Sequence, residues 1–103
     1  MKEYIYWVQM DIPTELESEF NRIYDTQHIP NILNVEGVSS CVRYKLVSSD
    51  VEGTAQYAAV YIVSDPNIPF STEWTRESDK GDWSMDIRPS TVNRSHIVFE
   101  KLP

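Results

Sequence analysis

Two residues in the first third of this sequence, Tyr24 and His28, have side chains suited to acid–base chemistry. They are four residues apart, which places them on one face of a helix. An imidazole that titrates near neutrality at a pocket wall can accept or donate a proton, and the Tyr24 hydroxyl could orient it or hold a substrate oxygen. The alternatives are a core tyrosine and a structural histidine that hydrogen-bonds a backbone carbonyl before Pro30.

A second set of residues could bind a ligand. Trp74 and Trp83 offer flat surfaces to an aromatic molecule, unless they only fill a small core. Arg43 and Tyr44 are adjacent on a candidate strand, so they point to opposite faces and only one can reach a cavity beside the helices. Arg43 could bind a carboxylate, although an ion pair with one of the 16 acidic residues is the simpler interpretation.

The end of the chain carries two weaker candidates. Asn93 is a further candidate for substrate binding, and His96 lies on the opposite parity of the same segment, with no second histidine nearby. The two histidines and the neighbouring carboxylates have no metal-ligand spacing, so we expect no metal. Because there is no glycine-rich phosphate loop and no Gly-x-Ser-x-Gly motif, nucleotide chemistry and hydrolase triads are disfavoured, and no cofactor is expected.

The hydrophobic pattern predicts four strands that position these residues. Segment 3–10 is aromatic and β-branched and too short for an independent helix. Segment 38–47 has apolar residues on one parity, whereas segment 55–63 is apolar on both. Segment 91–99 is the fourth candidate strand.

Two helices are predicted between these strands. The apolar residues of segment 14–28 gather on one helical face. Pro30 disfavours helical geometry at Ile29, so this helix should stop at the end of that segment, and Pro30 should open a short second turn. A weaker helix fits residues 70–78, with Trp74 on its inner side.

The resulting order of elements predicts a ferredoxin-like βαββαβ sandwich of the α+β class, with a four-stranded antiparallel sheet and helices on one face. A sheet covered on one face should alternate cleanly between apolar and polar residues. Segments 3–10 and 55–63 are instead apolar on both faces. In so short a chain the second face is best covered by another copy, so we expect a homodimer joined through its sheet faces.

Length and net charge limit the number of domains and the classes of partner. The 103 residues leave room for a single domain, 1–103, and 16 acidic against 9 basic side chains give a net charge of −7. That charge disfavours nucleic acid and anionic membranes, and no apolar run approaches the length of a membrane span. With one cysteine and no signal-peptide pattern, we expect a cytoplasmic location.

Residues 19–30 (EFNRIYDTQHIP) resemble the EthD-like branch of the dimeric α+β barrel superfamily, whose members often carry an F-x-x-W/Y-Y-x-x-x-H-x-P stretch on the first helix. Other landmarks that resemble this branch follow along most of the chain: Val35-Glu36-Gly37-Val38, Arg43-Tyr44, Trp74, Gly81-Asp82-Trp83, Arg88-Pro89 and Asn93-Arg94.

The resemblance implies two copies packed sheet to sheet, each with a cavity between its sheet and its helices. The superfamily includes cofactor-free oxygenases, isomerases, cyclases, lyases and haem-degrading proteins, so it does not select a reaction. The first hypothesis is a cofactor-independent enzyme that transfers a proton through His28 on a hydrophobic carbonyl-bearing or phenolic molecule. The alternative is a non-catalytic module for small-ligand binding or dimerisation, and haem binding with oxidative cleavage is a third possibility.

Overall fold

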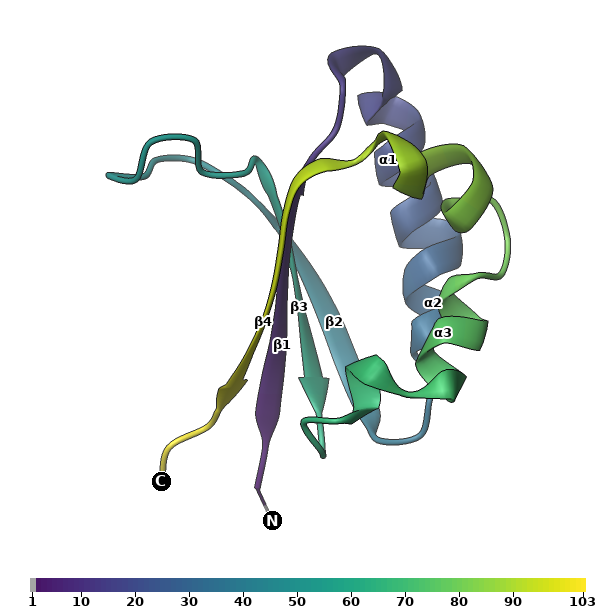
Figure 1. The fold of residues 1–103 in the computed structure, drawn as a ribbon, viewed down its shortest axis with the longest axis vertical. Helices are drawn as coiled ribbons and strands as arrows, with labels where there is room; N and C mark the ends of the chain where they lie inside the picture. The colour runs from purple at the N-terminus through teal and green to yellow at the C-terminus, as the bar shows by residue number, and fades with distance from the viewer. Residues whose placement is uncertain (1) are drawn as a thin grey trace.

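A four-stranded antiparallel sheet carries the helices on one face in the computed structural model, which describes residues 2–103 (Figure 1). The strands are β1 (Tyr4–Asp11), β2 (Val38–Lys45), β3 (Tyr57–Val63) and β4 (Val92–Glu100). Their order across the sheet is β2-β3-β1-β4, so β1 and β3 lie in the centre. The ferredoxin-like α+β fold expected from the sequence is therefore confirmed.

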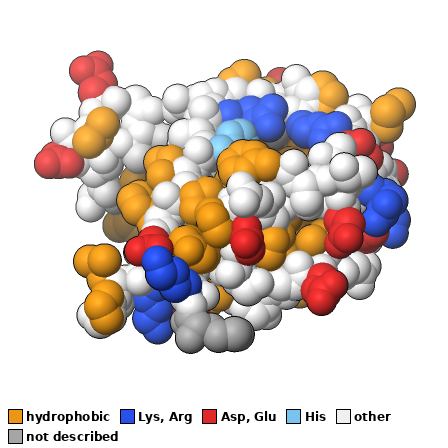
Figure 2. Space-filling view, turned by 60° about the horizontal axis from the view of Figure 1, so that its bottom comes forward, with side chains coloured by type: hydrophobic (Ala, Val, Ile, Leu, Met, Phe, Trp, Pro, Cys, Tyr) orange, Lys and Arg blue, Asp and Glu red, His pale blue; other side chains and the backbone are white. Residues whose placement is uncertain are grey.

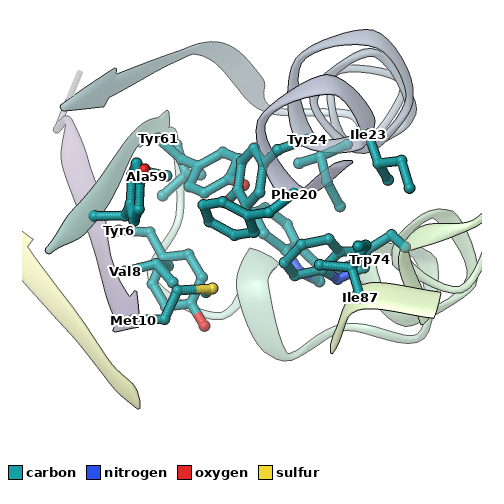
Figure 3. Packing of buried hydrophobic residues seen from close by; sticks show 14 residues of the cluster. Tyr6, Val8, Met10, Phe20, Ile23, Tyr24, Ala59, Tyr61, Trp74 and Ile87 are labelled. Carbon is teal, nitrogen blue, oxygen red and sulfur yellow. The ribbon is translucent and has the colours of Figure 1, made fainter. Parts of the chain in front are cut away.

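The central strands bury alternate residues against the helices, as a sheet covered on one face requires. β3 is buried at every second position, and β1 follows the same alternation from Tyr6 to Met10. Tyr6 lies opposite Tyr61 in the register of these two strands. Figure 3 shows Tyr61 beside Tyr24 of the helix layer, so the core is an aromatic cluster between the two layers.

The first helical region continues further than the sequence predicts. It consists of a 3-10 turn (Thr14–Leu16), α1 (Glu17–Ile23), a π turn (Tyr24–His28) and α2 (Ile29–Ile32). The prediction that Pro30 ends the helix near His28 is wrong, because Ile29 has helical backbone angles (φ −59°, ψ −50°). The Ile29 N–H donates to the Tyr24 carbonyl, five residues back. This wider turn relieves the clash between a proline ring and the carbonyl four residues earlier.

The second helix is confirmed to within two residues of its predicted bounds. A 3-10 turn (Ile68–Phe70) leads into α3 (Thr72–Ser78). The Ser71 hydroxyl accepts a hydrogen bond from the Trp74 N–H at 3.1 Å, which caps the start of α3. Trp74 is buried, as its predicted inner position requires.

The segment between α3 and β4 forms two short turns that the sequence analysis did not predict. A π turn (Trp83–Ile87) is followed directly by a 3-10 turn (Arg88–Ser90). Trp83 and Ile87 are buried in the core, and the segment closes one end of the helix layer. Among residues 2–103, no helix has both the length and the apolar character needed to cross a membrane.

The other face of the sheet has no helix over it (Figure 1). On this face Val42 and Tyr44 of β2 are 50% and 55% exposed, and Ile97 and Phe99 of β4 are 40% and 50% exposed. The loop between β2 and β3 extends away from the helices on the same side. The second apolar face expected from the sequence is therefore present and open in the single chain.

Candidate functional site

A cavity of about 180 Å³ lies between the helices and the sheet. Its wall contains three tyrosines, two tryptophans, two histidines and two arginines, and no aspartate or glutamate. The first helical region contributes Tyr24 and His28, α3 contributes Trp74, and the following π turn contributes Trp83. Four residues selected from the sequence therefore meet at one cavity.

His28 is held in this wall by aromatic rings alone. Its imidazole stacks on Trp83 with ring centroids 4.5 Å apart and planes 27° from parallel, and it meets the edge of Tyr24 at 4.8 Å. The side chain is only 6% exposed, and Nδ1 is buried without a hydrogen-bond partner among residues 2–103. Nε2 is not enclosed in this way, so it is the nitrogen that reaches the cavity.

Burial keeps His28 neutral. Loss of hydration, with smaller contributions from the positive charges of Arg88 and Arg43, lowers the pKa of His28 to about 3. The expectation that this imidazole titrates near neutrality is therefore wrong, because the sequence does not reveal how completely the ring is enclosed. At neutral pH the side chain offers one lone pair and one N–H.

The hydroxyl of Tyr24 is engaged with a second tyrosine. The Tyr24 and Tyr61 hydroxyl oxygens are 2.6 Å apart, and both side chains line the cavity. Burial raises the pKa of both hydroxyls, so both stay protonated at neutral pH. One proton lies between the two oxygens, and Tyr61 also interacts with the thiol of Cys41. Tyr24 thus contacts His28 through its ring, and its hydroxyl belongs to a tyrosine pair.

The two tryptophans lie in the cavity wall on different elements. Trp83 stacks on His28, as described above. Trp74 meets the edge of Tyr61 at 5.1 Å and of Tyr6 at 5.4 Å. Both indoles are at least nine-tenths buried, so they serve the core and the cavity together.

Arg43 and Tyr44 lie outside this cavity. Arg43 points to the helix side, where it pairs with Asp25 at 2.9 Å and donates to the Asn21 side-chain oxygen at 2.9 Å. Its guanidinium lies 4.6 Å from the centroid of the Tyr24 ring. This ion pair is the simpler of the two interpretations that the sequence offered for Arg43. Tyr44 is on the open sheet face, and both residues border a separate, open groove beside α1.

Asn93 has a structural place at the start of β4. It adopts a positive φ of 53°, and its amide donates to the Asp11 carboxylate at 3.0 Å and to the Gly53 carbonyl at 2.8 Å. These bonds connect the start of β4 to the end of β1 and to the loop between β2 and β3. Asn93 is not among the residues that line the cavity.

Three further cavity residues have titratable or charged side chains: Arg88, Arg94 and His96. The sequence analysis placed His96 among its weaker candidates and gave no role to Arg88 or Arg94. His96 lies opposite Val8 in the register, and its ring stacks over Tyr6 at 6.1 Å. The signal was available, because His96 and Arg94 share the parity of Val98, which packs against the core. Arg88 lies in the turns that were not predicted.

Comparison with known families concerns the first two-thirds of the chain. Residues 3–69 match the model of a family described as a domain of unknown function, DUF4286. The chain belongs to the DUF4286 family. The matched segment contains the first three strands with Tyr24 and His28, whereas both cavity tryptophans and both cavity arginines follow it. A comparison with curated proteins found no match.

Solved structures share the fold of this DUF4286 protein. An EthD family protein from Bacillus halodurans is 13% identical, covers 99% of this chain and 100% of its own, and has a TM-score of 0.65. The haem degrader MhuD from Mycobacterium tuberculosis, with two haems bound, is 12% identical over 97% of this chain and 96% of its own, with a TM-score of 0.67. At these identities the likeness concerns the fold, and at that level the EthD-like resemblance is confirmed.

A dabb family protein with a ferredoxin-like fold, from Mesorhizobium loti, extends this comparison. It is 13% identical, covers all of this chain and 98% of its own, and has a TM-score of 0.56. The DUF4286 chain is therefore a small α+β module of the kind found in EthD, dabb and haem-degrading proteins. Within residues 2–103 it has no cluster of three or more side chains able to ligate a metal.

Proposed function

We propose that this protein is a small cofactor-independent enzyme that acts on a hydrophobic carbonyl-bearing or phenolic molecule, with His28 as the proton acceptor. The observation that carries the proposal is the unpartnered imidazole of His28 in the cavity wall. A buried polar atom without a partner costs about 1–3 kcal/mol of stability. A structural histidine would bond a backbone carbonyl, whereas Nδ1 of His28 has no such bond within residues 2–103.

The neighbouring groups suit proton removal beside an oxygen. Neutral His28 can accept a proton from a phenolic hydroxyl or from a carbon next to a carbonyl. The tyrosine pair, Tyr24 and Tyr61, lines the same cavity, and its hydroxyl groups are donors that can stabilise the negative charge that forms on the oxygen. Trp74 and Trp83 limit access of water to the same space.

The cavity volume defines the size of the substrate. A cavity of about 150 Å³ holds one benzene molecule, and the volume here is about 180 Å³. This volume suits a single ring with a small substituent. Haem, with its four pyrrole rings, is larger than this volume.

The test follows proton exchange, because it needs no knowledge of the final product. Single-ring ketones, with phenylacetone as the first probe, are incubated with the protein in deuterium oxide, and loss of the C–H signal is measured by NMR. We expect exchange above the buffer rate, reduced at least about 100-fold in His28→Gln, since general bases contribute factors of that size. The exposed variant Arg76→Gln, outside the cavity, is the control.

One observation favours the alternative of a non-catalytic binding module. A pKa of about 3 makes His28 a weak base in the free protein. The two functions separate in the same experiment. Ligand-induced NMR shifts at the cavity without any exchange above the buffer rate would refute the enzyme and support the binding module.

We also propose that the chain works as a homodimer joined through its open sheet faces. The support is the apolar face of exposed residues on β2 and β4, which a monomer in water would leave uncovered. Light scattering should give twice the chain mass of 12.0 kDa, that is about 24 kDa. A mass of one chain at micromolar concentration would overturn this proposal.

A further inference from the structure

The cavity has a charge opposite to that of the whole chain. Acidic residues outnumber basic ones by 16 to 9 in the sequence. The charged residues of the cavity wall are nevertheless Arg88 and Arg94 alone. Figure 2 shows blue cationic side chains above and to the right of a pale blue histidine, with no red carboxylate between them. This concentration of positive charge next to apolar surface favours a negatively charged ligand.

Arg94 is the cation available to such a ligand. Seven of the nine basic side chains form ion pairs among residues 2–103, and Arg94 is one of the two that do not. The other is Arg76, which does not line the cavity. Arg94 is exposed on β4, next to the cavity ring of His96. A planar guanidinium in this position can form two parallel hydrogen bonds with a carboxylate.

Arg88 is the second cation of the cavity wall. One of its terminal nitrogens is 2.9 Å from the Asp79 carboxylate, which fixes the side chain in place. A guanidinium has five N–H donors, so this contact leaves others for a ligand. Asp79 itself does not line the cavity. The cavity wall therefore contains two cations and no carboxylate.

We propose that the cavity binds a single-ring aromatic carboxylate, with its ring against Trp74 and Trp83 and its carboxylate paired with Arg94. The ring suits the aromatic wall and the volume of about 180 Å³. The carboxylate suits the unpaired cation at the opening. The inference rests on the proposed function for the location of the site, but it requires no turnover.

An anion in this place also explains how a weakly basic His28 can act as a base. The charged and titratable groups around His28 are Arg43 from β2, Arg88 from the 3-10 turn, and the neutral hydroxyls of Tyr24 and Tyr61. Burial is the main cause of the low pKa of His28 and remains when a ligand binds, but a bound carboxylate opposes the smaller contributions of the two arginines and so shifts this pKa upward from about 3.

The pKa of His96 should report the binding of a carboxylate to Arg94. Burial and the charge of Arg94 both lower its pKa, and its ring packs on Tyr6 of β1. A carboxylate bound to Arg94 removes the second of these effects, so the NMR titration of His96 should move to higher pH on binding. A neutral ligand should leave it in place.

The experiment compares benzoate with benzamide, which has the same ring without the charge. Calorimetric and NMR titrations are made on the intact chain at pH 7 and low salt, with wild type, Arg94→Gln and Arg76→Gln. We expect benzoate to bind wild type and Arg76→Gln about tenfold more tightly than benzamide, a difference typical of a charge-assisted hydrogen bond. In Arg94→Gln the two ligands should bind alike.

Equal binding of benzoate and benzamide to wild type would overturn the inference, as would failure of both to bind. Equal losses in Arg94→Gln and Arg76→Gln would also overturn it, because the effect would then be one of net charge. If circular dichroism shows that Arg94→Gln is misfolded, two measurements on wild type test the inference instead: the benzoate and benzamide affinities, and the shift in the His96 titration. Benzoate binding without proton exchange of the ketone panel would support this inference while refuting the proposed enzyme.

Discussion

Replacing His28 by phenylalanine should make the protein more stable while removing its proton acceptor. The substitution eliminates a buried Nδ1 that has no partner, which is worth about 1–3 kcal/mol. The His28 and Trp83 ring centroids are 4.5 Å apart, and a phenylalanine ring at position 28 retains this stacking. Its larger ring can extend into the adjacent cavity of about 180 Å³, so little overpacking strain is expected. The net gain should be about 1 kcal/mol.

Urea unfolding measures this gain. For a small domain the free energy of unfolding changes by about 1–3 kcal/mol per molar urea, so the midpoint should rise by about 0.5 M with an unchanged slope. The transition is followed by circular dichroism, because tryptophan fluorescence responds directly to the change beside Trp83. All variants are measured at one protein concentration, since a dimer would make the midpoint depend on concentration.

Tyr24→Phe is the matched control for this substitution. It removes a hydroxyl whose oxygen is 2.6 Å from that of Tyr61, a satisfied hydrogen bond in the same wall. It should therefore lower the free energy of unfolding by about 1 kcal/mol. The reasoning about His28 is refuted if His28→Phe is destabilised as much as this control, because the imidazole would then have a structural role.

Three further outcomes are expected. The pKa of His28 is about 3 in the folded state and about 6.5 in the unfolded state, so between these pH values the unfolded state binds more protons and stability falls as the pH falls. In urea unfolding, wild type should therefore lose about 2 kcal/mol more than His28→Phe between pH 7 and pH 5. Gly37→Ala should be about 1 kcal/mol more destabilising than Gly53→Ala in thermal melts: both glycines have positive φ, but only at Gly37 would the new methyl group meet other atoms, at 2.5 and 2.6 Å. Burial raises the pKa of Cys41 to about 11, so its alkylation by iodoacetamide at pH 8 should be at least about 100-fold slower than in urea, and equal rates would show that the thiol is accessible.

The strands could be predicted because their pattern is local. Each predicted strand agrees with an observed one to within two residues at either end, since aromatic and β-branched runs between turn residues leave little choice. The continuation of the first helix through Pro30 could not be predicted from proline preference alone. It depends on a π turn, which proline preference does not take into account.

The candidate site was predictable where a residue lies on a regular helix. His28, Tyr24 and Trp74 follow from helical periodicity, and the structure brings all three to the cavity. Arg88 was missed because short turns around Gly81 and Pro89 have no hydrophobic period. Arg94 was given no role and His96 only a weak one. The two share the parity of Val98, but which parity faces the cavity depends on the register of the sheet, which is set by partners far away in sequence.

The π turn between α1 and α2 also sets the angular phase of the whole first helical region. Four residues rotate an α-helix by about 400°, so residues spaced by four drift about 40° around the axis at each step. The buried residues Phe20, Tyr24, His28 and Ile32 have this spacing, yet all four face the sheet. The π turn has more residues per revolution than an α-helix. The step from Tyr24 to His28 therefore rotates the chain by less than a full turn, which opposes the drift of the other two steps. Four or more buried positions in a row, each four residues after the last, are thus a signature by which such a turn could be recognised in other sequences. Deleting one residue of the π turn would rotate Ile32 and the chain beyond it away from the core.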